Sequence, residues 1–191
     1  MAGERAFARR GARAWTAATA AAAMLALAAA GAAPPARADG VPSFAAPGAE
    51  AGPVTGRPLP RYVSLKAKRA YVRRGPSRAH RVDWVLVRRG MPLQIIAEYG
   101  NWRRVRDMDG AAGWVHYSLL RGDRTAIVLP DELALREAPA ENAKPTARAE
   151  AGVIVALEAC RPQWCLVEAG RAQGWAPKKS LWGVDPAEVF K

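Results

Sequence analysis

Cysteine and histidine commonly carry out catalysis, but their spacing in this sequence does not favour it. A thiolate nucleophile needs a histidine base and a third polar residue that orients the base. The two cysteines are Cys160 and Cys165, whereas the two histidines, His80 and His116, lie in an earlier part of the chain. A Ser-His-Asp arrangement remains open from the inventory, but domains of about 60 residues leave little volume for a preorganised pocket. We therefore expect a protein without enzymatic activity.

The C-x4-C spacing of the cysteines allows two interpretations. In an exported chain, an even pair of cysteines at short spacing is most simply a disulfide. The same pair could form half of a zinc site, but the other ligands would have to come from distant histidines. We predict a disulfide between Cys160 and Cys165, and we expect neither a metal nor a cofactor.

Arginines and aromatic residues near predicted loops and strand ends are better candidates for a binding site. Arginine pairs bidentately with carboxylates and phosphates, and aromatic rings anchor peptides or stack on sugars. The alternative is that the arginines are solvated and that some rings build the core, where we expect Trp114 and Trp175. The candidate ligand-binding residues are Arg73, Arg74, Arg78, Trp84, Tyr99, Trp102 and Tyr117.

The part of the sequence that must position these side chains is a repeat of two similar copies. Residues 90–120 align with residues 152–181, apart from a one-residue deletion in a turn. A repeat of about 60 residues is too long for a solenoid unit and long enough for a small domain. The matched pairs are Gly90 and Gly152, Trp102 and Trp164, Val105 and Val167, Gly113-Trp114 and Gly174-Trp175, and Leu120 and Leu181.

Each copy is typical of a small β-barrel, with short strands, tight turns and no long helical period. In the first copy we expect a polar loop over 73–82, a single 3₁₀ turn over 118–120 and a final strand over 125–129 that closes the sheet. The other strands predicted in that copy span 71–72, 84–87, 93–99, 102–107 and 113–115. The second copy repeats the order, with strands over 133–136, 153–160, 164–168 and 174–176.

The two central hairpins predict cross-strand pairs. A two-residue turn at Gly100-Asn101 places Tyr99 opposite Trp102, Glu98 opposite Arg103 and Ile96 opposite Val105. A turn at Pro162-Gln163 places Cys160 opposite Cys165, at the positions that Glu98 and Arg103 hold in the first copy. Directly opposed strand residues have the separation that a disulfide requires. An ion pair at the first position would contribute about 0–1 kcal/mol if it is exposed.

The order of strands and the Gly-Trp motifs resemble those of bacterial SH3-like (SH3b) domains. More narrowly, the phrases NWRRVRD and DGAAGWVH, together with the CRPQWC segment of the second copy, resemble the paired SH3-domain exported proteins of alphaproteobacteria. The resemblance covers about residues 61–184. It implies an all-β fold of two tandem SH3-like barrels outside the cytoplasm, with no established activity. Other SH3b modules bind cell-wall peptides, often beside a hydrolase domain.

The N-terminal residues have the layout of a secretory signal peptide. A basic segment precedes an alanine-rich stretch, and Ala36-Arg37-Ala38 fits a cleavage site. An uncleaved membrane anchor is the alternative. We expect cleavage after Ala38 and a periplasmic or secreted protein. The predicted organisation is a signal peptide over 1–38, a flexible Pro/Ala/Gly-rich linker over 39–60, a basic SH3-like domain over 61–124 and a disulfide-containing one over 125–185.

The two copies differ in net charge. Residues 61–124 hold 15 Lys and Arg against five Asp and Glu, a net of +10, and residues 125–191 hold eight against nine, a net of −1. A basic domain attracts anions, although the same arginines could simply coat a solvated surface. We expect a binding module for peptidoglycan peptide or an envelope-protein segment, without a specific nucleic-acid partner. The alternative is electrostatic association with anionic lipid or lipopolysaccharide, or a role as a structural adaptor in the envelope.

Overall fold

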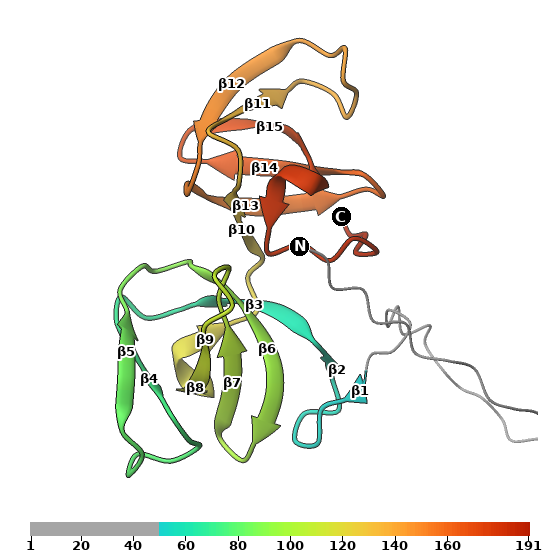
Figure 1. Cartoon of the computed structure of the whole chain (residues 1–191). Coiled ribbons are helices and arrows are strands. Elements are labelled where there is room, and N and C mark those ends of the chain that lie inside the picture. The colour runs from blue at the N-terminus through green and yellow to red at the C-terminus, as the bar shows by residue number, and fades with distance from the viewer. Residues whose placement is uncertain (1–49) are drawn as a thin grey trace, which may run out of the picture. The chain divides into compact units, whose positions relative to one another are not determined.

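The computed structural model of the chain describes residues 50–191, and almost all of its regular structure is β (Figure 1). The described residues form two seven-stranded antiparallel sheets and one two-stranded hairpin. The predicted signal peptide and its cleavage site, and the first part of the predicted linker, lie outside the described residues. No helix in residues 50–191 is long and apolar enough to cross a membrane.

The first sheet and its loops are called the first domain here. The strand order is β5-β4-β8-β7-β6-β3-β9. The elements are β3 (Arg61–Leu65), β4 (Ala70–Arg73), β5 (Val82–Leu86), β6 (Pro92–Tyr99), β7 (Trp102–Arg106), β8 (Ala112–His116), the 3₁₀ turn η1 (Tyr117–Leu119) and β9 (Leu120–Arg121).

The second sheet, with residues 183–191, is called the second domain. Its strand order is β12-β11-β15-β14-β13-β10-β16, which repeats the order of the first sheet. The sequence duplication is therefore a duplication of topology. The elements are β10 (Thr125–Val128), β11 (Glu132–Arg136), β12 (Pro145–Glu150), β13 (Ile154–Cys160), β14 (Trp164–Ala169), β15 (Ala172–Pro177), the 3₁₀ turn η2 (Lys178–Ser180) and β16 (Leu181–Trp182).

One predicted strand belongs to the other copy. Residues 125–129 were expected to close the first sheet, but β10 pairs with β13 and β16 of the second sheet. The equivalent place in the first sheet is taken by β3, which pairs with β6 and β9. Each domain therefore begins with this strand. All four residues of β10 are buried, but only Ala126 and Val128 belong to the second core, because alternate side chains of a strand face opposite sides.

Each domain has a core of its own, made of aliphatic residues that alternate along the strands. Leu65, Val72 and Val115 are fully buried in the first core, as Leu135, Val155 and Val167 are in the second. The expectation that Trp114 and Trp175 lie in the core is wrong, because both rings are only half-buried and belong to neither core. Their glycine neighbours have a steric role: a Cβ on Gly113 would lie 2.5 Å from the Val72 side chain.

The central hairpins follow the predicted register at their turns and depart from it farther away. Glu98 pairs with Arg103, and Cys160 pairs with Cys165, as predicted. Val105, however, pairs with Ile95 and not with Ile96, because a β-bulge shifts the register between Ile95 and Ala97. A matching bulge lies between Leu157 and Ala159. The extra residue of each bulge reverses which side chains face inward along the rest of the strand. Glu98, three residues after Ile95, and Cys160, three residues after Leu157, are therefore buried.

The bulges place chemically different pairs in equivalent interiors. Cys160 and Cys165 form the predicted disulfide and are both fully buried. In the first domain the Glu98 and Arg103 side chains are 0% and 8% exposed, with 3.4 Å between the Arg103 Nε and a Glu98 carboxylate oxygen. The predicted ion pair therefore exists, but inside the domain and not on its surface.

The segment before the first domain is structured where the linker was expected to be flexible. β1 (Glu50–Ala51) pairs with β2 (Pro58–Leu59), and the loop between them closes on the Glu98 carboxylate. The backbone N–H groups of Val54 and Thr55 donate to Glu98 Oε2 at 3.1 and 2.9 Å, and the Thr55 hydroxyl donates to Oε1 at 2.7 Å. A buried carboxylate needs such donors, which a sequence search for turn and strand signals does not reveal.

Candidate functional site

The first domain has a cleft of about 180 Å³ at one end of its sheet. β4, the loop that follows it, the start of β7 and the β8–η1 junction all contribute side chains. Three of the predicted binding residues meet here, together with four residues that were not predicted. The lining residues are Tyr71, Arg73, Arg78, Trp102, His116, Ser118 and Leu119.

Arg73 shapes the loop that borders this cleft. Its Nη1 atom donates to the backbone carbonyls of Arg78 and His80, at 3.0 and 2.7 Å. These bonds occupy part of its guanidinium and hold the loop so that Arg78 lies at the cleft. Arg78 is exposed and, among residues 50–191, forms no salt bridge. Neither arginine is paired with an acid among residues 50–191, but only Arg78 keeps its whole guanidinium free of hydrogen bonds, so Arg78 is the better donor to a ligand.

His116 and Trp102 form the aromatic part of the cleft. The His116 Nδ1 lies 2.7 Å from the Ser118 hydroxyl and accepts the Ser118 backbone N–H at 3.4 Å. The tautomer that accepts this N–H at Nδ1 is the one with its hydrogen on Nε2, which makes Nε2 a donor. The ring packs edge-on against Trp102, with centroids 5.5 Å apart. His116 is the residue directly before η1, and its place before the predicted 3₁₀ turn is the sequence signal that could have identified it.

The other predicted residues lie outside this cleft. Tyr117 is 51% exposed and borders it, with its ring centroid 5.0 Å from that of His116. Tyr99 is 65% exposed at the end of β6. Arg74 faces Asp83 at 3.5 Å and is held on the surface. Trp84 packs against the first core and serves the fold.

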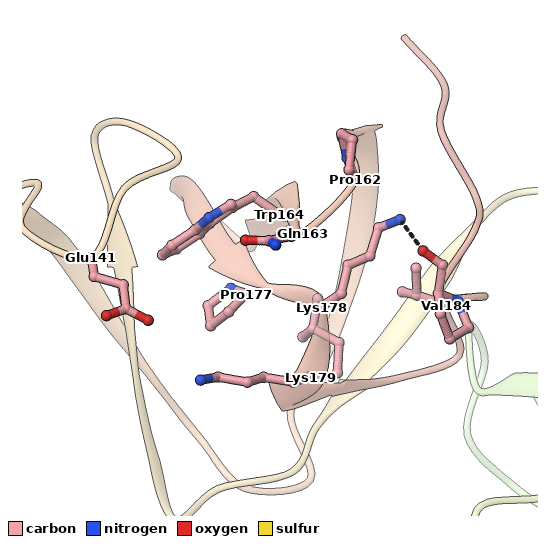
Figure 2. A pocket seen from close by; sticks show the side chains of 10 residues that line it. Glu141, Pro162, Gln163, Trp164, Pro177, Lys178, Lys179 and Val184 are labelled. Carbon is pink, nitrogen blue, oxygen red and sulfur yellow. Dashed lines mark hydrogen bonds between the residues drawn. The ribbon is translucent and has the colours of Figure 1, made fainter.

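The second domain has a larger cleft, of about 600 Å³, in the corresponding place (Figure 2). Trp164 lines it as Trp102 lines the first, and Pro177 takes the place of His116 in the repeat. No residue of this cleft was among the predicted binding residues, because the basic charge that indicates an anion site in the sequence lies in the first copy. The lining residues are Glu141, Pro162, Gln163, Trp164, Pro177, Lys178, Lys179, Leu181, Val184 and Pro186.

Neither cleft has the ligands of a metal centre. Within residues 50–191 no group of three or more His, Cys, Asp or Glu side chains is arranged to hold a metal ion. Both cysteines are bonded to each other. What the clefts offer is hydrogen-bond donors, charge and aromatic surface.

Comparison with known proteins identifies the repeated unit. The family described as "Bacterial SH3 domain" matches residues 66–122 and 130–183, one match in each domain. Together these segments make up more than half of the chain. Each one covers the strands of one sheet except the first, since β3 and β10 lie before the matched residues. No curated protein matches the sequence significantly.

Several solved structures are similar in outline. NlpC1 and NlpC2 from Trichomonas vaginalis are each 12% identical with a TM-score of 0.31, and an NlpC/P60 family protein from Bacillus cereus is 12% identical with a TM-score of 0.30. The matches cover 64%, 66% and 63% of this chain, and 45%, 51% and 55% of those chains. The chain thus spans about half the length of these proteins, and likeness at this level carries no argument about activity.

Proposed function

Because the chain belongs to the bacterial SH3 domain family, we propose that it is a non-catalytic binding protein of the cell envelope. The first domain binds peptides that carry free carboxylates, such as the stem peptides of peptidoglycan, in the Trp102 cleft. Its place is the periplasm or the cell exterior, which the layout of the N-terminal residues supports. A segment of an envelope protein with a similar carboxylate would bind in the same way.

The meeting of Arg78, Trp102 and His116 in one cleft carries this proposal. A guanidinium binds a carboxylate through parallel hydrogen bonds, and the His116 Nε2–H is a second donor. The Trp102 ring supplies rigid apolar surface at low entropic cost. No acidic side chain lines the cleft, so nothing in it repels an anionic ligand.

Co-sedimentation of the mature protein with purified peptidoglycan tests the proposal. We expect Trp102→Ala and Arg78→Ala to weaken binding about tenfold each. Arg89→Ala is the matched control, because Arg89 is exposed in the same domain and does not line the cleft. Equal losses in all three variants, or no binding by the unaltered protein, would contradict the proposal.

Electrostatic association with anionic lipid or lipopolysaccharide is the second candidate, and the net charge of +10 over residues 61–124 favours it. Binding of this kind spreads over many arginines and is screened by salt. Vesicles of phosphatidylglycerol, with phosphatidylcholine vesicles for comparison, distinguish the two. Retention on phosphatidylglycerol that survives Trp102→Ala and disappears at high salt would favour the lipid surface over the cleft.

A further inference from the structure

The loop that borders the cleft is held in the same way in both domains. Arg73 donates to the His80 carbonyl, and Arg136, its counterpart in the repeat, donates to the Ala143 carbonyl at 2.7 Å. The carbonyls that accept these bonds are themselves counterparts. Both copies therefore keep the hydrogen bond from an arginine to a loop carbonyl that holds this loop beside the cleft.

The charge that the loop brings to the cleft is reversed. Arg78 lines the first cleft, and Glu141 occupies the corresponding place in the second. At the opposite side, Ser118 of the first cleft corresponds to Lys179 of the second. A carboxylate in this position repels the anionic ligands that Arg78 attracts, and repulsion of this kind is a common source of specificity between related sites. The second cleft therefore presents a carboxylate beside the Lys179 amine, whereas the first presents only cationic charge, from its two arginines.

The second cleft also has a wall that lies outside the family match. Val184 and Pro186 line it, whereas the match to the bacterial SH3 domain ends at residue 183. The backbone of Phe190 pairs with that of Cys160 by two hydrogen bonds, of 2.8 and 3.1 Å. Glu188 is bound by the Arg124 guanidinium, with 2.7 Å between Arg124 Nε and Glu188 Oε1. These contacts hold residues 183–190 against the second sheet.

Lys178 belongs to the wall and not to the ligand contacts. It is 9% exposed, and its Nζ donates to the Pro186 carbonyl at 3.1 Å, the bond drawn as a dashed line in Figure 2. The Nζ also donates to the Glu188 carbonyl. Its removal from water lowers the pKa of the amine. The exposed charged groups that line the cleft are therefore Glu141 and Lys179.

We propose that the Trp164 cleft of the second domain is a separate site for peptides that carry an amine, with Glu141 as its charged contact. An ammonium group forms charge-assisted hydrogen bonds with a carboxylate and is attracted to the face of an indole ring. Pro162 and Pro177 add apolar surface beside Trp164. A volume of about 600 Å³ is within the usual range for a small-molecule or short-peptide site. The proposal rests on the proposed function as a peptide-binding protein.

A matched pair of peptides tests this site on the full mature chain. The probes are Ala-Lys-Ala, acetylated at the N-terminus and amidated at the C-terminus, with the lysine amine free or acetylated. We expect the free amine to shift the NMR signals of the Trp164 indole N–H and of the backbone N–H groups of Glu141 and Lys179. Acetylation of the amine weakens binding about tenfold, as Glu141→Gln does. Glu168→Gln is the control, since Glu168 is exposed on the same domain and does not line the cleft.

Two results overturn the proposal. One is the absence of any shift around Trp164 at ~10 mM of the free-amine probe, a concentration that would detect millimolar affinity. The other is equal binding of the free and acetylated probes, which would show that the amine is not recognised. Glu141→Arg adds a second check, because it places in the second cleft the charge of the first and must abolish binding of the amine probe.

This experiment separates the second cleft from the first. A carboxylate probe, Ala-Ala with a free C-terminus and an acetylated N-terminus, reports on Trp102 and Arg78. If that probe binds and the amine probe does not, the inference about the second cleft is wrong while the proposed function stands. If only the amine probe binds, the assignment of the first cleft is wrong.

Discussion

At the scale of single residues, Glu98 connects several segments of the first domain through its buried carboxylate. Its carboxylate, which is fully buried, lies 2.5 Å from the Arg61 guanidinium and 3.4 Å from that of Arg103. It also accepts three hydrogen bonds from Val54 and Thr55. One carboxylate thus joins the N-terminal hairpin, β3 and the central hairpin, and its loss would leave buried cations without a counter-charge.

We expect Glu98→Gln to lower the free energy of unfolding of the first domain by about 3 kcal/mol, because removal of one partner of a buried ion pair leaves the other uncompensated. Urea denaturation followed by tryptophan fluorescence measures the change. Glu132→Gln removes an exposed partner of Arg148 and serves as the control, with an expected cost of about 0–1 kcal/mol. Similar costs for the two variants would contradict the structural role of Glu98.

The same residue predicts a dependence on acid. Burial by itself raises the pKa of Glu98, but hydrogen bonds from Arg61 and Thr55 outweigh it and hold the pKa at about 2, below the ordinary value of 4.5. A carboxyl with a depressed pKa stabilises the folded state above its unfolded pKa and loses that contribution as pH falls toward the folded pKa. We therefore expect the urea midpoint of the first domain to fall between pH 5 and pH 2, and to fall less in Glu98→Gln.

At the scale of elements, the two central hairpins fill the same buried position with chemically different side chains. In each, a bulge turns the residue at the hairpin end inward: Glu98 in β6 and Cys160 in β13. The first hairpin then needs an ion network, and the second is cross-linked. A covalent link in a short loop restricts the hairpin, whereas the ion network ties together segments that are distant in sequence.

Replacement of both cysteines, Cys160→Ala with Cys165→Ala, is expected to cost about 2 kcal/mol of stability in the second domain on the basis of loop entropy. Thermal unfolding of the oxidised protein, the reduced protein and the double variant measures it. The first domain, which holds no cysteine, is the internal reference. A double variant as stable as the oxidised protein would show that packing alone holds the hairpin and that the disulfide adds no stability.

The C-terminal segment is expected to depend on Lys178. In Lys178→Met the carbonyls of Pro186 and Glu188 lose their buried donor, so the segment opens more often. The Cys160 backbone N–H, which donates to the Phe190 carbonyl, should then exchange with solvent about tenfold faster. The Leu157 N–H donates to the Arg124 carbonyl and reports on the sheet itself. Equal acceleration at both positions would indicate general loosening and not release of the segment.

At the scale of the whole molecule, the two copies have the same fold but differ in the side chains of their clefts. The copies keep the strand order, the bulged hairpin and the loop held by Arg73 or Arg136. They differ in net charge, in the charged residue at the cleft and in the cleft's volume. On the proposed function, we expect the two domains to bind chemically different groups and to respond differently to salt.

We expect salt to act unequally on the ligands of the two halves. Raising the salt concentration from 0.05 to about 0.5 M shortens the Debye length from roughly 14 to 4 Å, so contacts spread over the arginines of residues 61–124 weaken most. Binding to phosphatidylglycerol vesicles should therefore fall steeply, and binding of the amine probe at the second cleft should fall less. Isothermal titration at several salt concentrations measures both, and a parallel decline would contradict separate sites.

The sequence by itself determined the repeat, the family, the positions of most strands along the chain and the pairing next to each hairpin turn. These properties are local: turn residues set the register nearby, and alternation marks the strands. Only the tertiary structure decided that β10 begins the second sheet, that bulges bury Glu98 and Cys160, and that residues 50–59 fold onto Glu98. It also decided that residues 183–190 build one wall of the larger cleft. Each of these depends on segments that meet across long stretches of chain, and neither strand alternation nor turn chemistry records which segments meet.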